Sequence, residues 1–245
     1  MPRFFVARED IEEGRVLIRH DDAFHIARSL RMAVGDTVTV SDGEGTDYTV
    51  RLTRIRDEEC CGEILEALPS HTEPECRITL LVAYPKGDKL ETVIQKAVEL
   101  GAYRIVPFES SRCIKRPKAE KADKLKARHA RIAEEAAKQC GRSRIPEVLS
   151  PVGYREALRI AGESELALLC YEDERGRSIK AALSDAGRVG SISVVVGAEG
   201  GFSPEEADEA HEAGLVSVGL GPRILRCETA PLYALSALSY EYELL

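Results

Sequence analysis

The chain has 245 residues, enough for one large domain or for a small domain joined to one of about 150 residues. Hydrophobic residues make up 44% and charged residues 31%, without long biased runs, which argues against a disordered chain. No stretch approaches the ~20 apolar residues that span a bilayer, and the first residues lack the apolar segment of a signal peptide. We therefore expect a cytoplasmic protein with no membrane contact.

The net charge of −8 is unevenly distributed along the chain. Between Arg112 and Arg144 there are twelve Lys and Arg residues against four acidic residues, so this segment carries +8 and the rest −16. A basic segment of this kind is typical of a strip that contacts phosphate, although a solvated helix face has a similar composition. The charge alone leaves both interpretations open.

The cysteines and histidines do not predict a metal site. The seven cysteines include no Cys-x-x-Cys pair, and the five histidines include no i, i+4 pair. An odd number of cysteines also agrees with a cytoplasmic protein. We expect no metal.

Residues 1–72 are predicted to form a small β-rich domain. Apolar and polar residues alternate over 38–40 and again over 48–52, and an Asp-Gly-Glu-Gly turn at 42–45 separates the two runs. A short helix is expected over about 22–32. This profile is typical of a small barrel.

The linker is expected at 69–74, where two prolines and small polar residues show no periodicity. Beyond it, over 73–245, strands and helices alternate, a pattern that predicts a mostly parallel sheet covered by helices. The apolar runs predicted as strands are 78–84, 105–108, 166–171, 192–197 and 216–220.

Two helices of this second domain have clear end signals. Asp88-x-x-Glu91 has the spacing of a capping box, and Gly101 stands where a C′ glycine is expected. Ser203-Pro204-Glu205-Glu206 combines a hydroxyl N-cap, a proline at N1 and a glutamate at N3, and Gly214 closes that helix.

Two unusual loops follow neighbouring predicted strands near the C-terminus. The first, 197–202, has three glycines, which permit φ > 0 and the close approach of a ligand, but its spacing is that of neither a dinucleotide-binding loop nor a Walker loop. The second is 220–230. Either loop alone could be a tight strand-to-helix turn. Because the carboxyl ends of parallel strands meet at one edge of a sheet, two such loops predict a single pocket.

The residues of these loops match a known family. Gly-x-Glu-Gly-Gly-Phe at 197–202, together with Leu-Gly-x-Arg-Ile-Leu-Arg-x-Glu-Thr-Ala at 220–230, resembles the RsmE family of 16S ribosomal RNA (uridine-N3)-methyltransferases, in the knotted SPOUT superfamily. The family usually has proline where Ala198 stands and threonine where Cys227 stands, and these departures bear on cofactor affinity more than on activity. The likeness continues at Arg3–Val6, His25–Arg31, Lys86–Lys89, Gln95–Lys96, Glu99–Gly101 and Glu134–Gln139.

This resemblance implies an α/β fold. It implies a PUA-like RNA-binding β-barrel over 1–72, followed over 73–245 by a SPOUT methyltransferase domain with a C-terminal trefoil knot, a rare exception to the rule against threaded chains. S-adenosylmethionine would bind bent in the knot. The residues implied to hold it are Leu169, Gly197, Glu199, Gly200, Leu220, Gly221, Ile224, Leu225 and Arg226.

The implied reaction is methylation of uridine N3 in 16S ribosomal RNA of the assembled small subunit. Methyl transfer is an in-line displacement, so alignment is the main task of the enzyme. The N3 proton must also be removed, or its anion favoured. The candidates are Glu228 as a base and Arg226 or Arg223 as a partner for the negative charge, although Glu228 and Arg226 could instead pair with each other.

The target base must leave its stack, and a stacking surface is therefore expected. Phe202 or Tyr233 could supply it, although either ring could instead belong to the core. Within the basic segment, Lys121, Lys124, Arg128 and Arg131 are predicted to contact RNA phosphates.

The C-terminal helix, about 231–245, carries more apolar residues than one core-facing stripe needs. Leu235 and Leu238 are expected to face the core, with Tyr233, Tyr240 and Leu244 on a broader arc. The excess predicts a homodimer, with the rim of a monomer's core as the alternative.

Two other functions stay open from the sequence. The chain could be a non-catalytic RNA-binding or ribosome-assembly factor with a degenerate methyltransferase domain, although the intact loops argue against this. It could also be a SPOUT methyltransferase that acts on another RNA site.

Overall fold

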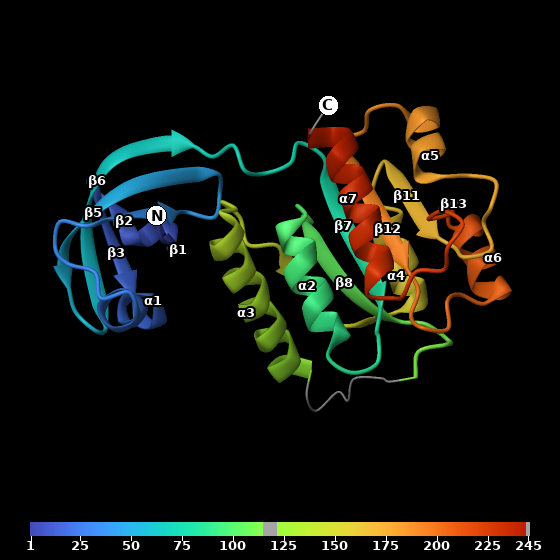
Figure 1. Cartoon of the computed structure of the whole chain (residues 1–245), viewed down its shortest axis with the longest axis horizontal. Helices are drawn as coiled ribbons and strands as arrows, with labels where there is room; N and C mark the ends of the chain where they lie inside the picture. Colours follow the sequence, from blue (N-terminus) through green and yellow to red (C-terminus); the bar gives the residue numbers. More distant parts are fainter. Residues whose placement is uncertain (115–121, 244–245) are drawn as a thin grey trace. The chain divides into compact units, whose positions relative to one another are not determined.

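The computed structural model describes residues 1–114 and 122–243 (Figure 1). The chain divides into two compact units. One consists of Met1–Glu73 with Ala137–Ile145, and the other of Pro74–Ala136 with Pro146–Leu245.

The segment 137–145 joins the first unit, whereas the sequence pattern assigned it to the second domain. Its Arg142 is buried and donates from Nε and Nη2 to the carboxylate of Glu73, at 3.2 and 2.5 Å. Ser41 Oγ donates to the carbonyl oxygen of Ser143 at 2.9 Å. Such contacts join residues far apart in the chain, so no local periodicity predicts them.

The first unit is built on a six-stranded sheet in the order β1-β4-β5-β6-β3-β2. Only the β1–β4 pair is parallel. Phe4, Val16, Ile18, Val38 and Val50 form part of its core. The strands are β1 (Arg3–Phe5), β2 (Ile11–Glu12), β3 (Arg15–Arg19), β4 (Thr37–Ser41), β5 (Thr46–Ile55) and β6 (Glu59–Pro69).

The predicted turn at 42–45 is confirmed, since it joins β4 to β5. The helix expected over 22–32 is instead two short helical segments: α1 (His20–Phe24) and the π-helix η2 (His25–Ser29). A further short 3₁₀ segment is η1 (Arg8–Asp10). Strand β6 extends to Pro69 and so uses the first residue of the expected linker.

The second unit contains a parallel sheet in the order β10-β8-β7-β12-β11-β13, with β9 beside β8. All five predicted strands are present in it, which confirms the mostly parallel sheet. Sequence patterning missed β9 and β10, because each has only two residues. The strands are β7 (Arg77–Ala83), β8 (Arg104–Glu109), β9 (Glu147–Val148), β10 (Val152–Gly153), β11 (Leu166–Cys170), β12 (Ser191–Val196) and β13 (Val216–Val218).

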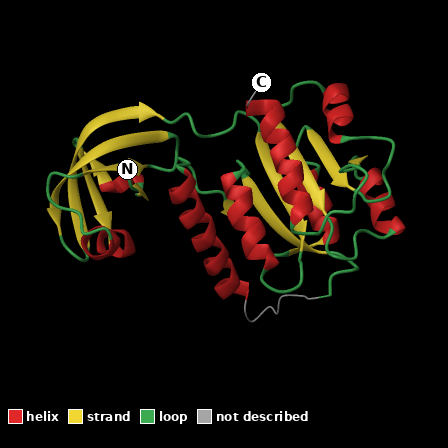
Figure 2. Cartoon of the chain, in the orientation of Figure 1, coloured by secondary structure: helices red, strands yellow, loops and turns green. Residues whose placement is uncertain are grey.

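Helices accompany this sheet, and α2 and α7 lie side by side against it (Figures 1 and 2). Both predicted helix ends at glycine are confirmed, because Gly101 and Gly214 have φ of +84° and +88° just beyond α2 and α6. The helices are α2 (Lys89–Glu99), α3 (Ala122–Cys140), α4 (Tyr154–Ala161), α5 (Ile179–Ala186), α6 (Pro204–Glu212) and α7 (Thr229–Glu243).

The two predicted capping boxes differ in outcome. At α6, Ser203 Oγ accepts from the amide of Glu206 at 3.2 Å while the Glu206 carboxylate accepts from the amide of Ser203 at 3.0 Å, which confirms the box. At α2, Asp88 makes no side-chain cap, so that prediction is wrong. An N-cap side chain reaches the first turn from an extended backbone, and Asp88 has φ −99° and ψ 12° instead.

The chain crosses back over the sheet after its last strand. β13 lies at the sheet edge beside β11, yet α7, which follows it, packs against β12 and α2. The connection between β13 and α7 therefore returns past the carboxyl end of β11. This path agrees with the C-terminal knot that the family resemblance implies.

Candidate active site

The two loops predicted to share a site do form one open pocket, of about 450 Å³, at the carboxyl edge of the parallel sheet. That volume is in the range of small-molecule sites. The pocket is lined by Lys89, residues 170–172, Glu174, Arg175, residues 196–201, residues 219–227 and Ala230.

Eight of the nine residues expected to hold the cofactor line this pocket: Gly197, Glu199, Gly200, Leu220, Gly221, Ile224, Leu225 and Arg226. Leu169 is the exception. It lies one residue before the end of β11 and is fully buried in the sheet, whereas Cys170 and Tyr171 reach the pocket. The sequence located the correct strand end but not the residue that emerges from it.

Two glycines allow the walls of the pocket to approach each other. A Cβ at Gly219 would overlap the backbone carbonyl oxygen of Glu174, and one at Gly201, where φ is +63°, would overlap the carboxylate of Glu172. A side chain at Gly219 would push pocket-lining segments apart, whereas at Gly201 the Glu172 carboxylate could move but the positive φ would strain any other residue. The loop glycines are therefore steric requirements of the pocket walls.

Lys89, at the start of α2, connects the two loops. Its Nζ lies 3.0 Å from Glu199 Oε1 in the first loop and 3.1 Å from Glu228 Oε2 in the second. The amide of Lys86 also donates to Glu199 Oε1, at 3.2 Å. The sequence signal for this contact is the Lys86–Lys89 stretch, which belongs to the family resemblance, but its role could not be assigned without the fold.

This ion cluster holds its carboxylates in the charged form. Burial opposes charge on Glu228, but hydrogen bonds from its own amide, the Cys227 thiol and Lys89 outweigh burial and lower its pKa. The pKa of Glu199 is lowered in the same way, against burial, by backbone amides and Lys89. Hydrogen bonds to Glu199 and Glu228 raise the pKa of Lys89. The cluster is thus one cation between two anions.

Cys227 stands where the family usually has threonine. Its Sγ donates to Glu228 Oε2 at 3.2 Å, and burial together with that hydrogen bond raises the thiol pKa to about 12. The thiol therefore stays protonated at neutral pH. It keeps the donor function of the usual hydroxyl in a weaker form.

The suggested pairing of Arg226 with Glu228 is wrong, because Glu228 pairs with Lys89. Arg226 and Arg223 are exposed, and neither forms an ion pair with a described residue. Both arginines thus line the pocket without an ion-pair partner among the described residues, while Glu228 is already paired with Lys89.

Phe202 is not available to stack on a base, contrary to one of the expectations. It is only 1% exposed, and its ring stacks on Phe108 with centroids 6.4 Å apart and planes 4° apart. Tyr154 lies against the same ring at 6.0 Å. The alternative, that Phe202 belongs to the core, is correct, while Tyr233 is 46% exposed.

We expect Phe202→Leu to lower the free energy of unfolding by about 1–3 kcal/mol, because it removes buried ring contacts. Urea denaturation followed by circular dichroism measures this change. Phe24→Leu is the control, because Phe24 is 53% exposed, and we expect it to stay within about 0.5 kcal/mol of the unsubstituted protein. Equal destabilisation of both variants would contradict the difference in burial.

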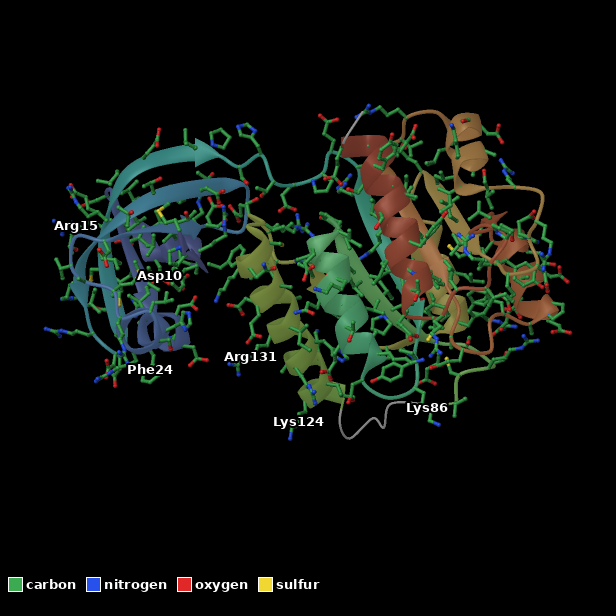
Figure 3. All side chains as sticks on the ribbon, viewed as in Figure 1. Asp10, Arg15, Phe24, Lys86, Lys124 and Arg131 are labelled. Carbon is green, nitrogen blue, oxygen red and sulfur yellow. The ribbon has the colours of Figure 1, made fainter. Side chains whose placement is uncertain are left out.

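The predicted phosphate-contacting residues lie along α3, except Lys121, which is outside the described residues. In Figure 3, Lys124 lies at the lower end of this helix and Arg131 on its side away from α2. Lys124 is exposed, while Arg128 pairs with Glu91 at 2.7 Å and Arg131 pairs with Glu135 at 3.1 Å. Both arginine side chains are well exposed, at 61% and 72%, so these pairs are weak and the arginines can exchange their carboxylates for other anions.

In the described part of the chain, no three His, Cys, Asp or Glu side chains gather as a metal site requires. Nor is any helix there long and apolar enough to cross a membrane.

Two protein-family models match this chain. A family model described as an RNA methyltransferase domain matches residues 72–239, and one described as an RNA methyltransferase PUA domain matches residues 18–65. The ribosomal RNA small subunit methyltransferase E of Bacillus subtilis is 33% identical, over 100% of this chain and 98% of that protein. The chain is therefore an RNA methyltransferase by class. It belongs to the family of the ribosomal RNA small subunit methyltransferases E, which confirms the family resemblance seen in the sequence.

Solved structures agree with this family. The ribosomal RNA small subunit methyltransferase E of Neisseria gonorrhoeae, bound to S-adenosyl methionine, matches with a TM-score of 0.86 and 36% identity, covering 99% of this chain and 98% of that one. A Legionella pneumophila protein in complex with the bound cofactor SAM matches with a TM-score of 0.87 and 30% identity, covering 98% and 97%. The α/β fold with an N-terminal PUA-like domain is thus confirmed.

Proposed function

We propose that this protein transfers a methyl group from S-adenosylmethionine to N3 of a uridine in 16S ribosomal RNA, within the assembled small subunit. The observation that carries the proposal is the single pocket formed by the loops 197–202 and 220–230 in a chain of this family. A substrate of this kind also supports a cytoplasmic location.

The residues present fit the proposed cofactor. Gly201 and Gly219 let the segments that form the pocket walls pack closely, and Ile224 and Leu225 line the same pocket with apolar side chains. Exposed backbone groups of such loops can read the adenine edge. When bound, S-adenosylmethionine would supply an electrophilic methyl group on a sulfonium.

The chain's own task is to orient the uridine and favour its N3 anion. Arg226 can partner negative charge on the base, because it lines the pocket and is paired with no described carboxylate, and Arg223 shares both properties. Glu228 is a weak base, since its pKa is lowered and Lys89 holds it. We therefore assign charge stabilisation to Arg226 ahead of proton removal by Glu228.

Mass spectrometry of small-subunit RNA tests the proposal. A strain that lacks the gene should lose one N3-methyluridine, and the purified protein should restore it in the presence of S-adenosylmethionine. Assembled small subunits should be methylated and naked RNA should not. An unchanged modification profile would contradict the proposal, and RNA binding without transfer would favour the non-catalytic assembly factor.

RNA binding through α3 is expected to depend on salt concentration. Replacing Lys124, Arg128 or Arg131 by alanine should reduce the slope of log K against log salt by roughly 0.7 to 0.9 per residue, because each removes one cation from a phosphate. These variants should keep cofactor binding but bind RNA more weakly, as measured by fluorescence anisotropy at several salt concentrations. An unchanged slope would mean that α3 presents only a solvated face.

We also propose a homodimer formed through α7. Leu235 and Leu238 are fully buried in their own unit, as expected, whereas Tyr233 and Tyr240 are 46% and 57% exposed. Leu244 lies outside the described residues. Light scattering should give about twice the 26.9 kDa of one chain, and Tyr240→Glu should shift the mass towards the monomer. A monomeric mass for the unsubstituted protein would refute the dimer.

A further inference from the structure

We propose that Lys89 is a positioning residue that couples the two loops of the cofactor pocket, so that neither loop keeps its shape without the other. This inference rests on the proposed function only in naming S-adenosylmethionine as the ligand. The coupling itself is a property of the protein without ligand.

Geometry is the first support. A single ammonium group lies 3.0 Å from Glu199 and 3.1 Å from Glu228, which belong to different loops. Lys89 begins α2, whose residues Leu90, Val93 and Ile94 are buried in the core of the unit. The Lys89 side chain therefore extends from a well-packed helix. Its two ion pairs fix the position of both loops relative to that helix.

Electrostatics is the second support. Two carboxylate oxygens that share one ammonium lie within about 6 Å of each other, a distance at which like charges repel appreciably. Both carboxylates have lowered pKa values and are charged at neutral pH. Removal of Lys89 thus leaves two negative charges close together with no cation between them, and the loops should separate.

The neutral hydrogen-bond donors nearby do not take over this role. The amide of Lys86 reaches only Glu199, and the Cys227 thiol reaches only Glu228. Among the described residues, Lys89 is the one whose side chain is ion-paired to both loops. Its side chain is 32% exposed and lines the pocket, so it lies next to the space that a ligand would occupy.

Lys89→Met tests this inference, with calorimetry of S-adenosylmethionine binding as the first readout. We expect the Kd to rise about tenfold, because both loops of the pocket lose the cation that they share. Lys89→Arg keeps the positive charge and should return the Kd to within about threefold of the unsubstituted value. Unchanged affinity in Lys89→Met would overturn the proposal.

Hydrogen–deuterium exchange without ligand is the second readout. In Lys89→Met, amide exchange should become faster in both 197–203 and 219–228. Faster exchange in only one loop, or in neither, would overturn the coupling. If the unsubstituted protein binds no S-adenosylmethionine, the proposed function fails, yet the exchange measurement still decides the role of Lys89.

Lys96→Met is the matched control. Lys96 lies on the same helix and pairs with a single carboxylate, Glu99 at 2.8 Å, away from the pocket lining. We expect it to leave the Kd and the exchange of both loops unchanged. An equal effect in this variant would mean that Lys89→Met acts through the stability of α2, which would also overturn the proposal.

Discussion

Gly219→Ala is expected to raise the Kd for S-adenosylmethionine at least about 100-fold, equivalent to about 2.7 kcal/mol. The added Cβ would overlap the backbone carbonyl oxygen of Glu174, and a backbone atom cannot swing aside as the end of a side chain can. Gly219 and Glu174 both line the pocket, so the displacement opens its wall. Isothermal calorimetry measures the change in affinity.

Folding must be separated from binding in this experiment. The overlap should cost about 1–3 kcal/mol of stability, which thermal unfolding detects as a lower Tm. Gly153→Ala is the matched control, because Gly153 has an ordinary φ of −74° and a Cβ there would meet nothing within 4 Å. Comparable reductions of affinity in both variants would contradict the steric argument.

A second variant covers the case in which Gly219→Ala does not fold. At Gly200 the nearest atom to an added Cβ is the Cβ of Arg112 at 2.9 Å, a milder overlap than the one at Gly219. Gly200→Val should therefore leave the protein folded while it narrows the pocket and abolishes cofactor binding. Undiminished binding by a folded Gly200→Val would contradict the assignment of this pocket.

Arg226→Ala is expected to lower kcat by about 10²- to 10³-fold, the usual effect of removing one group that stabilises charge in the transition state. Its side chain is exposed and has no ion pair with a described residue, so stability should change by less than about 0.5 kcal/mol. Cofactor affinity should stay within about threefold. Arg223→Ala separates the two arginines, and a larger effect there would transfer the role to Arg223.

Glu228→Gln is the companion test, because it removes the charge but keeps the shape of the side chain. A general base typically contributes 10²- to 10⁴-fold, whereas we expect a reduction of kcat below about tenfold. The pKa of Glu228 is lowered, so this carboxylate is charged throughout the neutral range and its titration falls below that range. The rate between pH 6 and 9 should therefore keep the same pH profile in Glu228→Gln. A reduction above 10²-fold with an altered profile would identify Glu228 as the base.

The amino-acid sequence determined the second unit's main strands and the helix after Ser203. These elements depend on apolar runs and on the spacing of Ser203, Pro204 and Glu206, which are local signals that remain visible without a fold. The pocket was also predictable, because parallel strands send the loops 197–202 and 220–230 to the same sheet edge.

Only the tertiary structure decided which side chains meet. Lys89 and Glu199 are 110 residues apart in the chain, and no periodicity encodes their contact. Phe202 ends a glycine-rich loop, yet its ring is stacked on Phe108 from another strand. Leu169, within β11, is fully buried, whereas Tyr171, just after the strand, lines the pocket. The sequence pattern does not distinguish between them. Local sequence sets the conformation of a segment, but burial and ion pairing depend on the partners that long-range packing brings to it.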